Sequence, residues 1–417
     1  MATIQFFGGV GVIGSSKIVI EQDGWRVLLD FGLEFNPGGG LYRQGIVPRP
    51  AHALSDRLLT GDAPWIPHIY DPDFSKGIDG LAVGNDHKTA VFITHAHLDH
   101  IGLTGYIDPH IPIWASPDTI EIMRAAHEAG EDLEGHWPKL RPLEAEHTLT
   151  FGPFTVMRYD VDHDIIGASG YSVATNSGIV AFTGDIRLHG RHPEKSLHFA
   201  HKVEGCKALV IEGTTLSFGF KDPVRTEHEV DEDFAKILEN TPGLVLLTIY
   251  PRNLERIEAF IKIVHAHHRE ILWSRSTAAF LKAMGLDVGA MSEESLPDIR
   301  KNSAHYVLQL NPSDWPLMLD LPLGPRSVFV HANGAPLGTF DPLWPVLQDW
   351  LRYVHTPFWP IGTGGHASPD GLRELLEIIH PDIVFPLHSQ EPDRLWPPPG
   401  TKRWLPERGR IYDLDSN

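Results

Sequence analysis

Four side chains able to bind a metal ion lie within six consecutive positions, 95–100, of this 417-residue chain. They are His95, His97, Asp99 and His100. Two imidazoles separated by one residue point to the same side of an extended backbone, and an acid and an imidazole on the following turn can face an adjacent position. Neutral imidazole and carboxylate are donors that zinc prefers. Neither a solvated loop nor a packed core commonly gathers four such groups, so the spacing predicts a metal site.

The elements around this segment indicate how it is positioned. Residues 89–93 form a short apolar run typical of a buried strand, so the four donors emerge where that strand meets a loop. Far along the chain, residues 372–379 show a helical apolar pattern and residues 383–387 predict another strand, with His388 at its tip. Strand ends therefore carry potential ligands in two distant parts of the sequence.

The N-terminal segment predicts a β-hairpin. Residues 17–20 and 25–29 read as strands joined at an Asp23-Gly24 turn. Residues 9–14 fit the GxGxxG pattern of dinucleotide-binding loops. That loop requires a helix directly after its glycines, whereas strands follow here, so we do not expect a dinucleotide site.

Between about residues 224 and 350 the pattern changes. A strand at 244–249, a helix at 253–268 and a strand at 271–273 follow one another. Because βαβ alternation implies a parallel sheet, this region is expected to form a second domain.

Composition limits the chemistry and the partners. Cys206 is the single cysteine, so no internal disulfide or thiolate cluster can form and any metal must be held by His and carboxylate. The net charge of -19 speaks against a surface that is basic throughout, as nucleic-acid binders often have. No run approaches the ~18 apolar residues of a membrane span, and the N-terminus lacks the basic start of a signal peptide. We therefore expect a cytoplasmic protein without a membrane partner.

The segment at 95–100 resembles the HxHxDH signature of the metallo-β-lactamase superfamily, and His163, Asp185 and His388 follow in the order that the family's later motifs require. This resemblance implies an α/β fold, the αββα four-layer sandwich of that superfamily. Residues 1–223 would form its N-terminal part, residues 224–350 an inserted cap, and residues 351–417 its C-terminal part.

The resemblance also implies two zinc ions per chain. One would bind His95, His97 and His163, the other would bind Asp99, His100 and His388, and Asp185 would lie between them. A hydroxide shared by the two ions would be the nucleophile. Asp30 matches the family's first motif and would orient a ligand, although it can also be read as an acid that merely ends a hairpin strand.

Three further segments resemble the β-CASP nucleases, with ribonuclease J among the nearest. They are Ile211-Glu212-Gly213-Thr214, Tyr250-Pro251-Arg252-Asn253 and Gly364-Gly365-His366-Ala367-Ser368. The resemblance implies a β-CASP α/β cap with a parallel sheet, and endonuclease or 5′-exonuclease action on single-stranded RNA or another nucleic acid. His366 would be the general acid, and Glu212 would hold its imidazole. Thr363-Gly364-Gly365 departs from the Ser-Gly that commonly precedes that His in ribonuclease J.

Substrate contacts can be suggested from the same region. Ser368 and Pro369 are favourable residues for starting a helix, and the N–H groups there, with Gly365, could receive a phosphate. Arg187, close after Asp185, could contact phosphate as well. The plain alternatives are a well-capped helix and an ordinary loop arginine.

Two other functions are compatible with the pattern. The same metal site could hydrolyse a small ester, lactone or nucleotide-like molecule, since this fold serves many substrates. A non-catalytic partner subunit is disfavoured because every ligand position is filled. The short stretch after His388 leads us to expect no C-terminal dimerisation domain, while the oligomeric state stays open.

Overall fold

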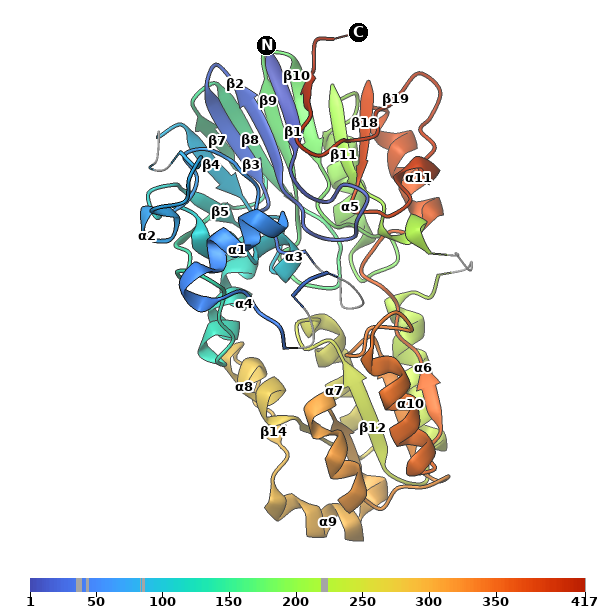
Figure 1. The fold of residues 1–417 in the computed structure, drawn as a ribbon. Coiled ribbons are helices and arrows are strands. Elements are labelled where there is room, and N and C mark those ends of the chain that lie inside the picture. The colour runs from blue at the N-terminus through green and yellow to red at the C-terminus, as the bar shows by residue number, and fades with distance from the viewer. Residues whose placement is uncertain (35–39, 43–44, 83, 85–86, 219–223, 417) are drawn as a thin grey trace.

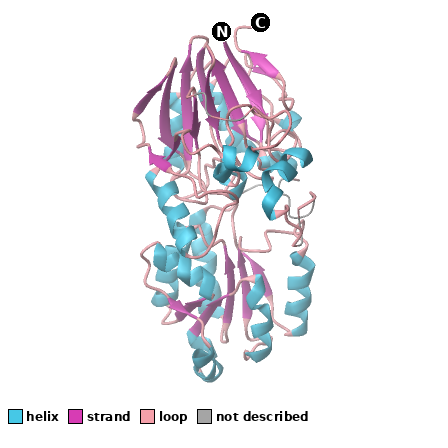
Figure 2. Ribbon diagram, turned by 60° about the vertical axis from the view of Figure 1, so that its left-hand side comes forward, coloured by secondary structure: helices cyan, strands magenta, loops and turns pink. Residues whose placement is uncertain are grey.

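A computed structural model describes residues 1–34, 40–42, 45–82, 84, 87–218 and 224–416. The chain forms two tiers (Figures 1 and 2): one holds two seven-stranded sheets and the other a six-stranded sheet. Both termini lie at the end of the first tier that is remote from the second (Figure 1). Among the described residues, no helix is long and apolar enough to span a membrane.

The first sheet has the strand order β20-β1-β2-β3-β4-β5-β6. Its strands are β1 (Ala2–Phe6), β2 (Ile18–Gln22), β3 (Trp25–Leu29), β4 (Thr89–Phe92), β5 (Ile113–Ala115), β6 (Leu140–Pro142) and β20 (Ile411–Asp413). β2 and β3 pair antiparallel across Asp23 and Gly24, whose φ angles of 52° and 75° suit a tight hairpin turn. The predicted hairpin is confirmed, and no helix follows the glycines of residues 9–14, as expected.

The second sheet has the order β19-β18-β11-β10-β9-β8-β7. Its strands are β7 (Thr148–Phe151), β8 (Phe154–Asp160), β9 (Ser169–Thr175), β10 (Gly178–Phe182), β11 (Ala208–Glu212), β18 (Ile383–Leu387) and β19 (Lys402–Arg403). β11 and β18 are parallel neighbours although the whole second tier separates them in sequence. The chain thus leaves this sheet after β11 and returns to it beside the same strand.

Alternating side chains show that the two sheets lie face to face between helices. Ile18 and Ile20 of β2 share one buried cluster with Ala208 and Val210 of β11. The intervening Val19 faces the helical side of its own sheet, as the strand period of two requires. The outer faces are covered by α4 (Pro117–Glu128) on the first sheet and by α5 (Pro193–Lys202) and α11 (Pro369–Ile379) on the second. This is the expected αββα sandwich.

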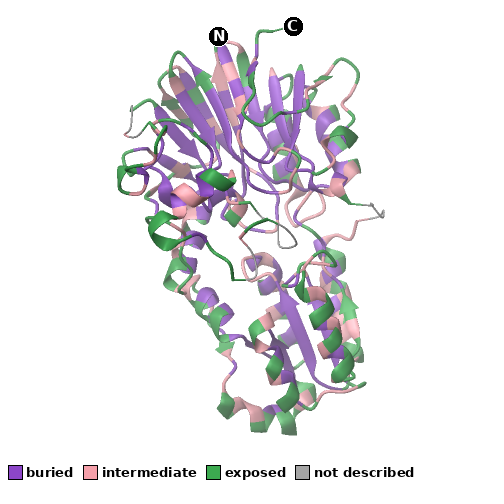
Figure 3. Ribbon diagram, in the orientation of Figure 1, coloured by how far each residue is buried: buried purple, intermediate pink, exposed green. Residues whose placement is uncertain are grey.

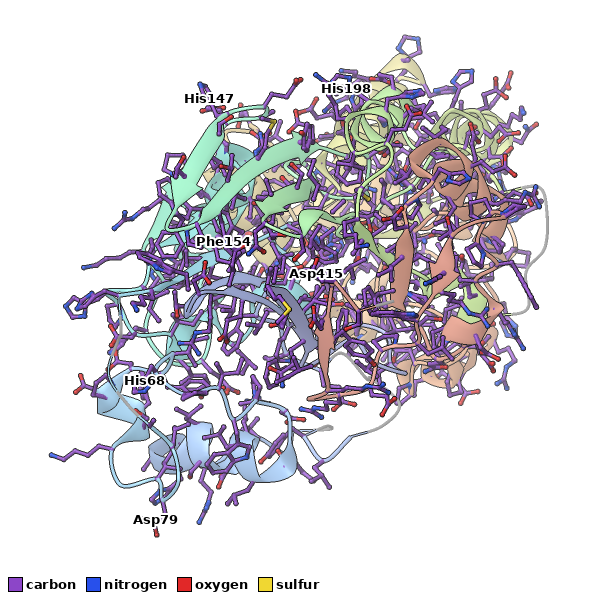
Figure 4. All side chains as sticks on the ribbon, turned by 90° about the horizontal axis from the view of Figure 1, so that it is seen from above. His68, Asp79, His147, Phe154, His198 and Asp415 are labelled. Carbon is purple, nitrogen blue, oxygen red and sulfur yellow. The ribbon has the colours of Figure 1, made fainter. Side chains whose placement is uncertain are left out.

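Burial follows these layers. The strands of the sandwich are largely buried, whereas the outward helix faces are exposed (Figure 3). Seen from above, Phe154, which has no exposed surface, lies within the body of the sandwich and Asp79 projects at its rim (Figure 4). Asp79 belongs to the segment between β3 and β4, which contains α1 (Ala53–Thr60) and α2 (Pro72–Ser75); parts of that segment lie outside the described residues.

The second tier is an all-parallel sheet with the order β14-β13-β15-β12-β16-β17. Its strands are β12 (Val245–Ile249), β13 (Glu270–Trp273), β14 (Gly289–Ala290), β15 (Tyr306–Gln309), β16 (Val328–Ala332) and β17 (Phe358–Pro360). Its helices are α6 (Glu227–Asn240), α7 (Leu254–Ala266), α8 (Arg275–Ala283), α9 (Leu296–Lys301) and α10 (Leu343–Tyr353).

The cap extends further than the predicted boundary at residue 350. The edge strand β17 pairs with β16 and so belongs to the cap sheet, although the predicted division assigned its residues to 351–417. A three-residue edge strand is too short to leave a clear sequence pattern.

Candidate active site

The candidate residues converge because several strands end at the same side of the sandwich, facing the cap. His95 follows β4, His163 follows β8, Asp185 follows β10, Glu212 ends β11 and His388 follows β18. A short helix, α3 (Leu98–Ile101), carries Asp99 and His100 back toward His95. His388 adopts a left-handed φ of 54°, which turns the chain sharply at the strand end, and its N–H donates to the Gly9 carbonyl at 2.8 Å.

Two groups of donors form, and they share Asp185. The first group is His95, His97, His163 and Asp185, whose donor atoms all lie within 4.8 Å of one another. Nδ1 of His97 lies 3.0 Å from Nε2 of His95 and 3.3 Å from Nε2 of His163. Donors that surround one zinc ion tetrahedrally at its usual bond lengths are separated by about 3.3 Å. This group has the spacing of a single cation site.

The second group is Asp99, His100, Asp185 and His388, with the same upper separation of 4.8 Å. Oδ2 of Asp185 lies 3.2 Å from Nε2 of His100 and 3.7 Å from Nε2 of His388. Oδ2 of Asp99 lies 3.1 Å from the same His388 nitrogen. Asp185 therefore stands where its carboxylate can reach both groups.

The electrostatics of the groups suit cation binding. Burial lowers the pKa of His95 well below its ordinary value and that of His97 to about 3, so both imidazoles are neutral and ready to donate electron pairs. Burial would raise the pKa of Asp185, but the neighbouring imidazoles, His388 and His100 foremost, hold it well below the ordinary value. His95 and His97 are therefore neutral beside an ionised Asp185.

His100 behaves differently from the other imidazoles. Burial alone would lower its pKa, but Asp185, Asp99 and Asp30 together raise it well above the ordinary value. The cluster of carboxylates thus needs a positive charge, which a proton on His100 supplies. A cation can take the place of that proton, so metal binding at this group is expected to release it.

Hydrogen bonds hold several of the rings by their second nitrogen. Oδ2 of Asp30, a buried carboxylate, lies 2.7 Å from Nδ1 of His100, and its Oδ1 accepts from the backbone N–H of Thr94 at 2.7 Å. This is the position in which Asp30 would orient a ligand. Oγ1 of Thr214 lies 2.8 Å from Nδ1 of His388 in the same way.

His366 and Glu212 lie beside the two groups. Nδ1 of His366 is 3.5 Å from Oε2 of Glu212 and 3.8 Å from Oδ2 of Asp185. Burial alone would lower the pKa of His366, but the charges of Glu212 and Asp185 outweigh it and raise the pKa to about 9. The side chain stays 24% exposed although Nδ1 is buried, so the opposite edge of the ring faces outward. Glu212, His366 and His388 also satisfy the spacing of a third donor group.

The loop before α11 is shaped around these side chains. Gly365 accepts a hydrogen bond from Nδ1 of His163 at 2.5 Å, and a Cβ at this position would lie 2.6 Å from both His163 and Asp164. Glu212 anchors the same loop, because its Oε1 accepts from the Ala367 N–H at 3.0 Å. Ser368 caps α11 by accepting from the Gly371 N–H at 3.0 Å. Gly365 and Ser368 thus have structural roles, whether or not substrate also touches them.

Arg187 does not fit the expectation of a phosphate contact. Its side chain is 1% exposed, and it forms ion pairs with Asp162 at 3.2 Å and with Glu227 at 2.9 Å. Glu227 opens α6 of the cap and also pairs with Arg256 of α7 at 2.6 Å. The guanidinium is enclosed by acids that the sequence places far away, so Arg187 is a buried link between sandwich and cap.

Three residues near the metal groups were not singled out for this position from the sequence. Asp164 follows His163 directly, and its Oδ1 lies 3.3 Å from Nε2 of that ring. Arg252 of the cap donates to the Ala96 carbonyl at 2.6 Å, and the Tyr250 ring lies 5.3 Å from that of His97. An acid directly after a candidate ligand was the available signal for Asp164. The other two are apparent only because the cap packs on the sandwich.

Comparison with known proteins agrees with this fold. Residues 81–230 match the model of the beta-lactamase superfamily domain. A crystal structure from Enterococcus faecalis V583, described as a protein of unknown function, superposes with a TM-score of 0.84, is 28% identical and covers 99% of both chains. Residues 81–230 thus resemble a beta-lactamase superfamily domain, and the whole chain shares its fold with the Enterococcus protein.

Curated relatives identify the branch that the chain resembles. A Ribonuclease J of Sinorhizobium meliloti is 30% identical over 302 residues, which are 69% of this chain and 51% of that protein. A Ribonuclease J of Pyrococcus abyssi is 22% identical over 429 residues, with 94% of this chain and 90% of that protein covered. The sequence is thus similar to ribonuclease J, although the chain spans only about half the length of the Sinorhizobium relative.

Proposed function

We propose that this protein is a metal-dependent phosphodiesterase that hydrolyses RNA, with a β-CASP type of cap over a two-zinc site. The observation that carries the proposal is the pair of donor groups joined by Asp185, with His366 and Glu212 beside them. The similarity to proteins named Ribonuclease J supports RNA as the substrate class.

The donor sets fit zinc. His95, His97 and His163 would hold one ion, Asp99, His100 and His388 the other, and Asp185 would contact both. Nε2 of His100 is buried and has no hydrogen-bond partner among the described residues, as expected of a nitrogen that faces a cation. When bound, two cations supply Lewis acidity, which lowers the pKa of water and stabilises charge on phosphate oxygens.

The chain's own residues would then handle the leaving group. His366 carries a proton near neutral pH because the carboxylates of Glu212 and Asp185 raise its pKa to about 9. Glu212 faces Nδ1, so the exposed edge of the ring is free to give a proton to the departing oxygen. Glu212 is itself held by the N–H groups of Thr214 and Ala367, at 2.8 and 3.0 Å, which keeps the pair in register.

The test combines metal analysis with cleavage assays. Purified protein should contain close to two zinc ions per chain and cleave single-stranded RNA. The variant His366→Ala should retain its zinc and lose at least roughly 100-fold in kcat, the usual scale of general acid catalysis. Wild-type protein free of metal after zinc supplementation, or full activity in His366→Ala, would contradict the proposal.

Product mapping would define the mode of cleavage. Matched RNA substrates with 5′-phosphate and 5′-hydroxyl ends distinguish exonuclease from endonuclease action. A 5′-exonuclease should release mononucleotides and prefer one of the two ends, whereas an endonuclease should produce internal fragments from both equally.

A second candidate is hydrolysis of a small ester, lactone or nucleotide-like molecule at the same site. The net charge of -19 favours it, because a long polyanion is repelled by an acidic protein. Turnover of such compounds far above the rate on RNA, lost in His366→Ala, would select this alternative.

A further inference from the structure

In most imidazoles of the two donor groups, the ring nitrogen that faces away from the group has a hydrogen-bond partner. The second nitrogen of four rings has a hydrogen-bond partner: Thr94 at 3.0 Å for His95, Asp30 at 2.7 Å for His100, Gly365 at 2.5 Å for His163 and Thr214 at 2.8 Å for His388. Such partners select the tautomer and the orientation of a metal-binding imidazole.

His97 is the exception. It presents Nδ1 to His95 and His163, so Nε2 is the nitrogen that points away from the first donor group. That Nε2 is buried and makes no hydrogen bond within the described part of the chain. If Nδ1 binds a cation, Nε2 carries a proton, and a buried N–H donor without an acceptor is costly.

A matching acceptor lies next to it. Oδ1 of Asp164 is buried and is likewise without a hydrogen-bond partner among the described residues. It lies 3.8 Å from Nε2 of His97, which is beyond hydrogen-bond distance. A buried donor and a buried acceptor thus lie near each other, and an approach of about 0.6 Å would bring them within hydrogen-bond distance.

The surroundings preserve room for this carboxylate. A Cβ on Gly365 would lie 2.6 Å from Cγ of Asp164, so the glycine leaves the space that the acid occupies. Asp164 also lies 3.3 Å from Nε2 of His163, which keeps its negative charge close to the first donor group.

We propose that Asp164 is the positioning residue of His97, accepting a hydrogen bond from its Nε2–H and so completing a carboxylate–imidazole–metal arrangement. This role rests on the proposed metal site. It mirrors Asp30 and His100 in the second donor group, so each cation would have one ligand imidazole backed by a carboxylate. A carboxylate behind the ring makes the imidazole a stronger donor and strengthens binding of that cation.

The first experiment measures zinc affinity by competition with a chromophoric chelator. Asp164→Ala should bind one of its two ions roughly 10 to 100-fold more weakly than wild type, the usual effect of losing such a partner, while the other ion is unaffected. The zinc affinity of Asp164→Asn should lie between those of wild type and Asp164→Ala, because the amide oxygen can accept the hydrogen bond but carries no charge. Asp160→Asn, on the preceding strand and paired with Arg158, is the control and should bind both ions as wild type does.

The second experiment observes the hydrogen bond itself. In zinc-loaded protein with 15N-labelled histidine, NMR should show a downfield, slowly exchanging Nε2–H for His97 that disappears in Asp164→Ala. An unchanged signal, or unchanged affinity for both ions, would overturn the role. Loss of an oxygen ligand in the Co2+ spectrum of Asp164→Ala, with the N–H signal retained, would instead make Asp164 a direct ligand and also overturn it.

The outcomes separate this role from the proposed function. If wild-type protein binds no zinc, both the proposed function and the role of Asp164 are excluded. Wild-type protein that binds two ions and cleaves RNA, together with an Asp164→Ala variant of equal zinc affinity, removes the role of Asp164 alone.

Discussion

His366 shows how neighbouring carboxylates can decide the protonation state of a candidate acid. Burial disfavours the imidazolium, yet Glu212 and Asp185 raise the pKa of His366 to about 9. A general acid must carry its proton, so activity that depends on His366 is present below this pKa and is lost as the pH rises through it. Cations bound at Asp185 would oppose the carboxylates and move this limit downward.

Replacing Glu212 with glutamine should shift that limit. The amide keeps the shape of the side chain but removes the charge at 3.5 Å from His366, so the pKa of the imidazole falls. The alkaline limb of the kcat–pH profile on RNA should move to lower pH by roughly 1 to 3 units. Glu391→Gln, at a half-buried acid that pairs with Arg394, serves as the control. An alkaline limb at the same pH in Glu212→Gln would mean that Glu212 does not act through this proton.

At the scale of elements, the stability of α11 affects the loop that holds His366 beside the two donor groups. Its N-terminus follows the loop that carries His366, and Ser368 satisfies one of its free N–H groups. Leu372, Leu375, Leu376 and Ile379 anchor the same helix against the second sheet. The end of the loop next to α11 is thus fixed both by the packing of the helix and by Glu212, which accepts from the Ala367 N–H.

Loss of the hydrogen bond from the Gly371 N–H to Ser368 should lower the stability of the fold more than the rate of hydrolysis. Ser368→Ala is expected to lower the free energy of unfolding by about 1 kcal/mol, whereas Ser368→Gly should cost only about a few tenths. Urea denaturation of the two variants beside wild type measures this order. If KM for RNA rose strongly in Ser368→Gly while stability was unchanged, Ser368 would be a substrate contact instead.

At the scale of the whole molecule, buried ion pairs join the cap to the sandwich. Glu227 of α6 receives Arg187 from the sandwich and Arg256 from α7, and all three side chains are 1% exposed. Arg256 also donates to the Thr363 carbonyl at 2.9 Å, close to His366. Cap placement and the geometry of the candidate acid are therefore coupled.

Glu227→Ala should be strongly destabilising, because it leaves two buried guanidinium groups short of a counter-charge. A loss of about 3–5 kcal/mol is expected in denaturant unfolding. Glu232→Ala on the same helix removes only exposed pairs with His228 and Lys236 and should cost less than about 1 kcal/mol. Equal effects from the two substitutions would show that the buried network contributes little.

Metal removal tests the whole molecule as well. The two donor groups come from both halves of the sandwich sequence, so bound cations stabilise the folded state over the unfolded one. Treatment with a chelator should lower Tm, and added zinc should restore it, with a gain of about 2.7 kcal/mol at a zinc concentration 100 times Kd. A Tm unaffected by chelation would exclude a structural contribution from metal.

Much of this architecture was predictable from local patterns. The hairpin at Asp23-Gly24, the strand before His95 and the helix and strand before His388 each follow from periodicity and turn chemistry, which act between near neighbours. The metal ligands could be proposed because the types of the side chains restrict their chemistry. The order of the motifs along the chain also indicated which distant residues would come together. The cap boundary at 350 was wrong, since the strand β17 is recognisable only by its partner β16.

Local patterns along the chain were enough to indicate the classes of side chain available to the site and the strands that carry them. Tertiary structure alone decided which groups come together: Arg187 pairs with Glu227 from the cap, and Oδ1 of Asp164 lies 3.8 Å from Nε2 of His97. The reason is physical. Hydrogen bonds and ion pairs act over a few ångströms in space, whereas periodicity along a chain reports only which face a residue occupies within its own element.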